Sequence, residues 1–156
     1  MSISRQNLTI VIVTFKSDEV INECIKSIGN EIRIIVVENS YNPEFKNKIE
    51  KTYQNVECII SSENLGMGKG NNLGINLAKT DYVLILNPDV ILEKTTLNEI
   101  FIASNIISNF AILAPISDNK AFPNYKIDNA SKILENKQSS FEVKSCLLYT
   151  SDAADE

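Results

Sequence analysis

Residues Leu8–Phe15 read LTIVIVTF, and this stretch points to the class of fold. It is a continuous apolar and β-branched run, which is typical of a strand covered on both faces. Four further strands are predicted downstream, at Ile32–Val37, Val56–Ile60, Tyr82–Leu86 and Ala111–Ala114. Buried strands at such intervals leave room for a helix in each connection, so the sequence between them is informative.

Helical spacing of apolar residues fills those connections. Predicted helices run through Val20–Ile28, Phe45–Tyr53, Leu73–Ala78 and Leu97–Ser104. Ser17 or Asp18 is expected to cap the first, and Gly29 to end it. Asn42 followed by Pro43 predicts the start of the second. Strands alternating with helices predict an α/β fold of three layers, α/β/α and Rossmann-like, with a mainly parallel sheet that is incomplete in this chain.

Composition excludes several functions. The 156 residues suit one domain, and the net charge of −5 comes without a Lys/Arg stripe, so no nucleic-acid partner is expected. The chain contains no histidine, which excludes Ser-His-Asp triads and His-bound zinc. Its three cysteines share no CxxC spacing and predict a reducing compartment. The expected location is the cytoplasm, with peripheral association at the inner face of the membrane as the second option for the full-length protein.

Polar residues follow the predicted strands at each carboxyl end, where parallel sheets bind ligands. The segments are Thr14–Lys16, Glu38–Ser40, Ser62–Asn72 and Asn87–Asp89. In the last, proline stops the strand and brings Asp89 to the rim, where a carboxylate suits Mg²⁺ or Mn²⁺. A plain turn is the alternative interpretation. Glu38 suits a ribose or base contact, with a helix cap or surface carboxylate as the alternative.

A glycine-rich block, Asn64–Gly74, reads NLGMGKGNNLG. Repeated glycines allow close approach of the backbone to a ligand, and the N-terminus of the helix that follows favours anions. The block lacks the GxxxxGK[ST] pattern of a P-loop. Lys69 within it is interpreted as a solvated loop lysine, with a phosphate contact as the alternative.

Together these segments resemble one family. IVIVTFKS, IIVVENS, ENLGMGKGNNLGI and DYVLILNPDV, in this order from Leu8 to Pro115, are similar to the inverting family 2 glycosyltransferases of bacteria, which have the GT-A fold. The resemblance is nearest to the rhamnosyltransferase-like branch, in which N-P-D replaces the usual D-x-D metal motif. It implies a nucleotide-diphosphate sugar as donor, for example dTDP-rhamnose or a UDP-sugar, and a glycan or lipid-linked acceptor in surface-polysaccharide synthesis.

The resemblance also implies roles for individual residues. The donor would be bound by Val13, Thr14, Phe15, Glu38, Asn39, Asn64, Gly66, Asn72, Asn87 and Asp89. Asp89 would hold the divalent cation, Mg²⁺ or Mn²⁺, that bridges the diphosphate. Glu38 stands where the family usually has Asp, and Asn87 supplies no charge, so nucleotide preference and metal affinity are expected to differ.

The end of the chain is predicted to be of another origin. Ile, Asn and Lys dominate up to Ser145, whereas CLLYTSDAADE at 146–156 contains none of them and looks like a translated sequencing adapter. The expected division is a donor-binding part at 1–145 and a non-native tail at 146–156, with the catalytic base beyond Ser145. A long loop at 117–140, a short helix at 130–134 and a strand start at 141–143 are also predicted.

Two other functions stay open at this stage. A nucleotidyltransferase shares the sheet and the metal-bound phosphates, but would carry a basic glycine-rich signature near the first strand, and Thr14–Asp18 has none. A non-catalytic nucleotide-binding module would lack the acidic motif expected further downstream.

Overall fold

The computed structural model describes residues 3–107 and 110–115. Strands and helices alternate along this part of the chain, as predicted. In order they are β1 (Leu8–Thr14), α1 (Ile21–Ile28), β2 (Arg33–Glu38), α2 (Pro43–Thr52), β3 (Val56–Ile60), α3 (Gly66–Leu77), β4 (Tyr82–Ile85) and α4 (Thr96–Ile106).

The four strands form one parallel sheet in the order β3-β2-β1-β4. Val11 of β1 pairs with Ile35 of β2 on one side and with Ile85 of β4 on the other. The chain therefore adds β2 and β3 on one side of β1 and then crosses to the opposite side for β4. This reversal beside β1 is the place where open α/β sheets bind ligands, outside the carboxyl ends of the strands.

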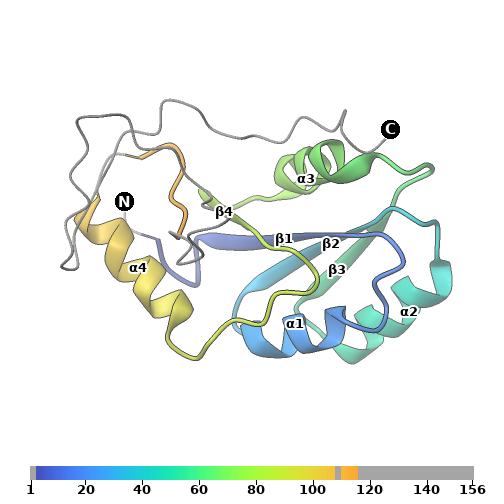
Figure 1. The fold of residues 1–156 in the computed structure, drawn as a ribbon, viewed down its shortest axis with the longest axis horizontal. Helices are drawn as coiled ribbons and strands as arrows, with labels where there is room; N and C mark the ends of the chain where they lie inside the picture. The colour runs from blue at the N-terminus through green and yellow to red at the C-terminus, as the bar shows by residue number, and fades with distance from the viewer. Residues whose placement is uncertain (1–2, 108–109, 116–156) are drawn as a thin grey trace, which may run out of the picture.

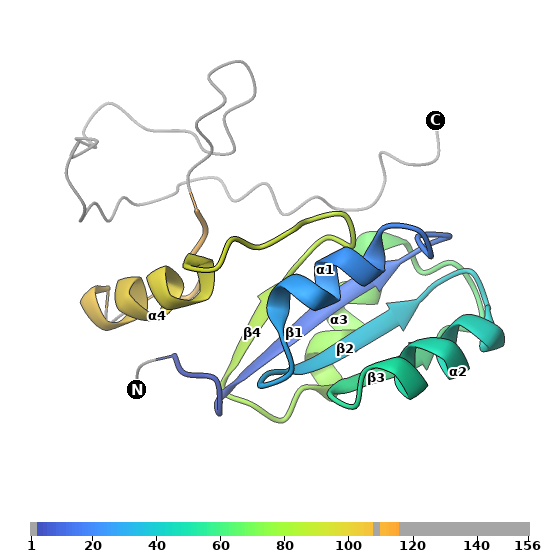
Figure 2. The same ribbon diagram turned by 90° about the horizontal axis from the view of Figure 1, so that it is seen from below.

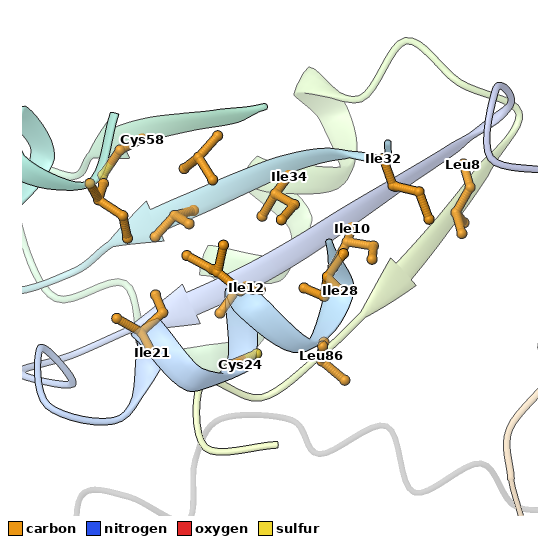
Figure 3. Close-up of a cluster of buried hydrophobic side chains, with 14 of the residues drawn as sticks. Leu8, Ile10, Ile12, Ile21, Cys24, Ile28, Ile32, Ile34, Cys58 and Leu86 are labelled. Carbon is orange, nitrogen blue, oxygen red and sulfur yellow. The ribbon is translucent and has the colours of Figure 1, made fainter. Parts of the chain in front are cut away.

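Helices cover both faces of the sheet (Figures 1 and 2), so the predicted three-layer fold is confirmed. Alternate residues of β1 point to opposite faces. Ile10 and Ile12 face α1, where Ile21 and Ile28 meet them in the larger core cluster (Figure 3). Val11 faces α3 in a smaller cluster with residues of β2.

The glycine-rich block differs from its prediction. It was expected as a turn before a helix, but α3 begins at Gly66 and most of the block is helical. A Cβ on Gly70 would lie 2.9 Å from Val13 Cγ1, and one on Gly74 would lie closer still to Val11. These two glycines therefore allow α3 to pack closely on β1, and their side-chain-free face meets the sheet rather than a ligand.

Three smaller expectations have clear outcomes. Asn42 caps α2, accepting a hydrogen bond from Phe45 N at 3.0 Å, and Gly29 ends α1 with φ of 86°. Neither Ser17 nor Asp18 caps α1 through its side chain, because α1 begins only at Ile21 with Val20 at the N-cap position; the Ser17 carbonyl accepts from the Val20 and Ile21 amides in the preceding turn. Ala111–Ala114 is not a strand: no described segment pairs with the outer side of β4, and Ile112 there is 63% exposed.

Some predictions lie outside the described residues, namely the long loop at 117–140 with its short helix, the strand start at 141–143 and the tail at 146–156. Within residues 3–107 and 110–115, no helix has the length and apolar character needed to cross a membrane.

Candidate functional site at the carboxyl edge of the sheet

The predicted site residues lie on the loops and element ends beyond β1, β2, β3 and β4, with two exceptions. Val13 lies within β1 and packs toward α3, beside Gly70. Asn72 lies exposed in the second turn of α3. The register places Thr14 opposite Glu38, and Asn39 N donates to Thr14 O at 2.9 Å, so the ends of β1 and β2 are joined.

Two buried polar atoms without hydrogen-bond partners mark this edge. Among the described residues they are Thr14 Oγ1 and Asn39 Oδ1, in side chains that are 2% and 4% exposed. Leaving a buried polar group unsatisfied costs about 1–3 kcal/mol, so native structures rarely do so without a ligand or a water molecule. Both atoms lie at strand ends where the fold predicts a ligand site.

Asn39 also connects this edge to the start of α3. Its Nδ2 donates to Gly66 O at 3.3 Å and lies 3.3 Å from the position that a Cβ on Gly70 would take. Gly66 has φ of 68°, a conformation that glycine adopts readily. Asn64 Oδ1 accepts from Gly66 N at 2.9 Å, which fixes the entry into the helix. Asn39, Asn64 and Gly66 are thus brought together.

Glu38 is buried, and its carboxylate is bonded to the loop that follows. Oε1 accepts from Ser40 N at 2.8 Å and from the Ser40 hydroxyl, and Oε2 accepts from Asn42 N at 2.7 Å. Asn42 caps α2, so the carboxylate lies at the positive end of that helix. The predicted surface carboxylate is therefore wrong, since the side chain is 2% exposed, whereas a supporting role at the α2 N-terminus fits the structure.

A hollow of about 410 Å³ opens between the β1–α1 and β2–α2 loops. Its lining is mostly polar and consists of Lys16, Ser17, Asp18, Glu19, Val20, Ser40 and Asn42. The two loops touch where Asn42 Nδ2 donates to Asp18 Oδ2 at 3.4 Å. Sites for small ligands are typically about 300–1,000 Å³, so the hollow has the size of a ligand subsite.

Each of these loops holds one residue in the left-handed region, Lys16 with φ of 53° and Tyr41 with φ of 54°. Such backbone strain gathers at functional sites. A second hollow, lined by residues including Gly29, Asn30 and Gln54, lies near the amino ends of β2 and β3. We favour the first as part of the site because parallel sheets bind ligands at the carboxyl edge.

Asp89 lies in a turn just after β4. Leu86 N donates to Val11 O at 3.0 Å as the last bond to β1, and Val90 N donates to Asn87 O at 3.2 Å across the turn. Asn87 and Asp89 are both exposed. The turn therefore presents the Asp89 carboxylate to solvent at the rim of the sheet, where it was expected from the sequence; the strand order adds that it lies on the far side of β1 from β2.

Helix α1 contacts this turn through the side chain of Cys24. Cys24 Sγ donates to Asn87 O at 3.6 Å, and burial, with a smaller contribution from the Asp89 charge, raises the pKa of the Cys24 thiol to about 11. The thiol therefore stays protonated near neutral pH and can act as a donor.

Comparison with known proteins agrees with this geometry. The sequence matches the family described as Glycosyl transferase family 2 over residues 9–106, which is more than half of the chain. The chain belongs to glycosyl transferase family 2. Membership of family 2 is thereby confirmed, while the inverting mechanism and the rhamnosyltransferase-like branch stay predictions; β1 through α4 are the elements that the match covers.

Two known proteins are similar to this family 2 chain, one in sequence and one in fold. It is 30% identical over 113 residues to the low-salt glycan biosynthesis hexosyltransferase Agl10 of Haloferax volcanii, across 70% of this chain and 36% of that protein. Its fold is similar to that of the mannosyltransferase PcManGT from Pyrobaculum calidifontis, solved with GDP-Man and Mn²⁺, with a TM-score of 0.55 and 18% identity over 64% of this chain and 33% of that one. The chain spans about a third of the length of each.

The candidate metal ligand of this family 2 chain fits a divalent cation that is coordinated by both the protein and a bound ligand. No cluster of three or more His, Cys, Asp or Glu side chains that could enclose a metal occurs among the described residues. An exposed single carboxylate such as Asp89 matches the mode of Mg²⁺, which proteins bind through one or two carboxylates while phosphate oxygens and water complete the shell. The residues present thus fit a metal that arrives with a diphosphate.

Sequence reasoning missed several residues of the site. Ser17 and Asp18 were assigned to a helix cap, but they line the hollow between the two loops. Cys24 was interpreted only from its spacing in the sequence, and Ser27 was given no role. Both residues contact the segment around Asp89. A contact between residues 63 or 65 positions apart leaves no signal in a single sequence.

Proposed function

We propose that this chain is the donor-binding part of a glycosyltransferase that takes a sugar from a nucleoside-diphosphate sugar. The observation that supports it most is the convergence, at one edge of a family 2 sheet, of two unsatisfied buried polar atoms with an exposed carboxylate at the end of β4. The base and ribose of a nucleoside diphosphate offer hydrogen-bond donors and acceptors to the two buried polar atoms. Its diphosphate offers negative charge that a cation can link to the exposed carboxylate.

The nucleoside end is assigned to the tips of β1 and β2. Phe15 is 49% exposed and offers an aromatic face for the base. Thr14 Oγ1 and Asn39 Oδ1 lack partners at these tips and would serve as donor and acceptor for base or ribose once a ligand displaces the groups that cover them. Glu38 shapes the loop that lines the hollow, and a direct contact of its carboxylate with ribose or base stays a prediction.

The diphosphate end is assigned to Asp89, with Asn87 beside it. A divalent cation, Mg²⁺ or Mn²⁺, would neutralise the charge that develops on the departing nucleoside diphosphate. Asp89 would hold it from the protein side, while the start of α3 at Asn64 and Gly66 borders the sugar-diphosphate. The mannosyltransferase of similar fold was solved with GDP-Man and Mn²⁺, which supports this type of ligand.

The transfer itself is proposed to be a single displacement that inverts the anomeric carbon. A carboxylate base would take the proton of the acceptor hydroxyl as that oxygen attacks and the nucleoside diphosphate leaves. We propose that this base lies beyond Ser145 in the longer protein, that 1–145 forms the donor-binding part and that 146–156 is a non-native tail. The acceptor would be a glycan or a lipid-linked glycan in polysaccharide synthesis, and the hexosyltransferase relative supports a hexose donor.

The remaining details of the proposal rest on the sequence resemblance. They are a rhamnosyltransferase-like specificity, a bacterial surface polysaccharide as product, and a cytoplasmic location with peripheral association at the membrane. A family 2 enzyme that uses cytoplasmic nucleotide sugars and a lipid-linked acceptor would work at that boundary.

The test is calorimetric titration of the chain with UDP, dTDP and GDP, in Mn²⁺ and in EDTA. Mn²⁺ is expected to strengthen binding of the preferred nucleotide by about tenfold or more, or about 1.4 kcal/mol. Asp89→Ala should abolish this enhancement and keep the melting temperature, because the exposed side chain packs against nothing in the core. Asp81→Ala, an exposed carboxylate at the other end of β4, is the matched control and should keep it. An enhancement that survives in Asp89→Ala would refute the assignment.

A further inference from the structure

The turn that carries Asp89 is tied to helix α1 at both ends. On the strand side, Cys24 Sγ donates to Asn87 O at 3.6 Å. On the far side, Leu92 N donates to Ser27 Oγ at 2.9 Å. Cys24 and Ser27 are three residues apart, so they lie on the same side of α1.

Ser27 is held in place to receive that bond. Its hydroxyl donates to Cys24 O at 2.7 Å, within the same helix, and this orients the oxygen lone pairs toward Leu92 N. Ser27 thus uses its donor inside α1 and its acceptor on the turn. A hydroxyl at this position satisfies a backbone amide that would otherwise lack a partner in a partly buried place.

Packing holds the same segment. Leu86 is 9% exposed and lies beside Cys24 in the core (Figure 3), while Val90 and Leu92 pack against the larger core cluster. Figure 2 shows the segment after β4 running back along α1 before it reaches α4. Asp89 projects from a segment whose neighbours on both sides are held, so the backbone from which its carboxylate extends has a defined position.

We propose that Cys24 and Ser27 are positioning residues for the metal-binding turn, holding Asp89 where a cation and a diphosphate can share it. This inference rests on the proposed function, because the contacts that hold the turn affect ligand binding only if Asp89 binds a cation. Supporting residues behind a metal ligand typically contribute about 10–100-fold to metal affinity, by fixing the ligand's position. Through these two residues, α1 would affect how tightly the nucleotide-sugar donor binds.

The variants are Ser27→Ala and Cys24→Ala. Their conservative partners are Ser27→Thr, which keeps the hydroxyl that accepts from Leu92 N, and Cys24→Ser, which replaces the thiol donor with a hydroxyl donor. The measured quantity is the ratio of nucleoside-diphosphate affinity in Mn²⁺ to that in EDTA. Each alanine variant should reduce the ratio by about tenfold, leave affinity in EDTA unchanged, and be rescued by its conservative partner.

Ser104→Ala is the matched control for Ser27. Ser104 Oγ donates to Phe101 O at 2.8 Å, three residues earlier in α4, and accepts from Ile3 N at 3.2 Å, so it makes the same pair of bonds far from the turn. Cys58→Ala is the control for Cys24, since Cys58 is also a buried thiol. Both controls should destabilise the fold and keep the Mn²⁺ ratio.

A readout without nucleotide accompanies the titration. Amide hydrogen exchange at Leu92 should speed up in Ser27→Ala and stay unchanged in Ser104→Ala. Broadening of the Val90 amide signal by Mn²⁺ alone reports the metal at the turn. An unchanged Mn²⁺ ratio in both alanine variants, or an equal loss in Ser104→Ala, would overturn the inference.

The same experiment separates this inference from the proposed function. If the wild-type chain shows no Mn²⁺ enhancement, the assignment of Asp89 fails and the inference fails with it. If the enhancement is present and Asp89→Ala abolishes it while Ser27→Ala and Cys24→Ala retain it, the proposed function stands and only the positioning role is refuted.

Discussion

Glu38→Ala provides the sharpest test of how the nucleoside end of the site is built. The wild-type carboxylate accepts bonds from Ser40 N, the Ser40 hydroxyl and Asn42 N, all within the β2–α2 loop. Alanine removes the acceptor and leaves two backbone amides unpaired beneath a side chain that was 2% exposed. The loop, the α2 N-terminus and the wall of the hollow formed by Ser40 and Asn42 should all lose order.

The magnitude follows from the count of bonds. A hydrogen bond to a charged group contributes about 1.5–3 kcal/mol, so two backbone bonds set an upper range of about 3–6 kcal/mol. Water entering the space and relaxation of the loop reduce this, and the charge of Glu38 no longer has to be buried. We expect the free energy of unfolding to fall by about 2–4 kcal/mol in urea or thermal melts.

Glu57→Ala is the matched control. Glu57 lies on β3 and its carboxylate pairs with Arg33 at 2.5 Å, with the two side chains 48% and 35% exposed. Exposed ion pairs of this kind contribute about 0–1 kcal/mol, so this variant should lose less than 1 kcal/mol. If Glu38→Ala is no less stable than Glu57→Ala, the loop does not depend on the buried carboxylate and the reasoning is wrong.

Three further predictions follow from the packing. Gly74→Ala should lower the melting temperature, because overpacking against β1 costs about 1–3 kcal/mol and exceeds the gain of about 1 kcal/mol in helix propensity; a higher melting temperature would contradict it. Asn42→Ala should cost about 1 kcal/mol in thermal melts through loss of the α2 cap, whereas Asn42→Ser, which keeps a capping oxygen and adds no charge beside Asp18, should cost less. Burial raises the pKa of Cys24 from 9.0 to about 11 and that of Cys58 to about 12, so unfolded thiols ionise first. The free energy of unfolding, measured in urea melts, should be highest below pH 9 and should fall as the pH rises toward 11–12. The fall should be less steep in a variant in which both cysteines are replaced by alanine.

Much of the fold could be predicted from the sequence because local patterns and burial agree. The run at Leu8–Phe15 is apolar or β-branched throughout, and β1 is indeed covered on both faces. Asn42 and Pro43 start α2 as expected, since a cap is a local feature. The strand expected at Ala111–Ala114 is not formed, because strand formation depends on pairing with a neighbouring strand, and this segment does not pair with β4 or with any other described strand.

The sequence predicted that polar residues at the strand ends share one edge of the sheet. The structure shows this arrangement, since parallel strands bring their carboxyl ends together, and a ligand site at that edge stays a prediction. The glycines of α3 were interpreted as a ligand-binding loop because a sequence does not show what a missing Cβ faces, and here it faces Val11 and Val13. The contacts of Cys24 and Ser27 with the Asp89 turn depend on tertiary packing alone.

The central claim is that a nucleoside diphosphate and a divalent cation bind at the carboxyl edge of this sheet. Amide NMR of the ¹⁵N-labelled chain, titrated with the preferred nucleoside diphosphate and Mn²⁺, tests it most directly. We predict chemical-shift changes at Phe15, Asn39 and Ser40 and paramagnetic broadening centred on Asp89. We predict no change at Asn30 or Gln54, which lie beside the second hollow at the opposite edge. Broadening centred on that opposite edge, or saturation without any effect near Asp89, would contradict the account.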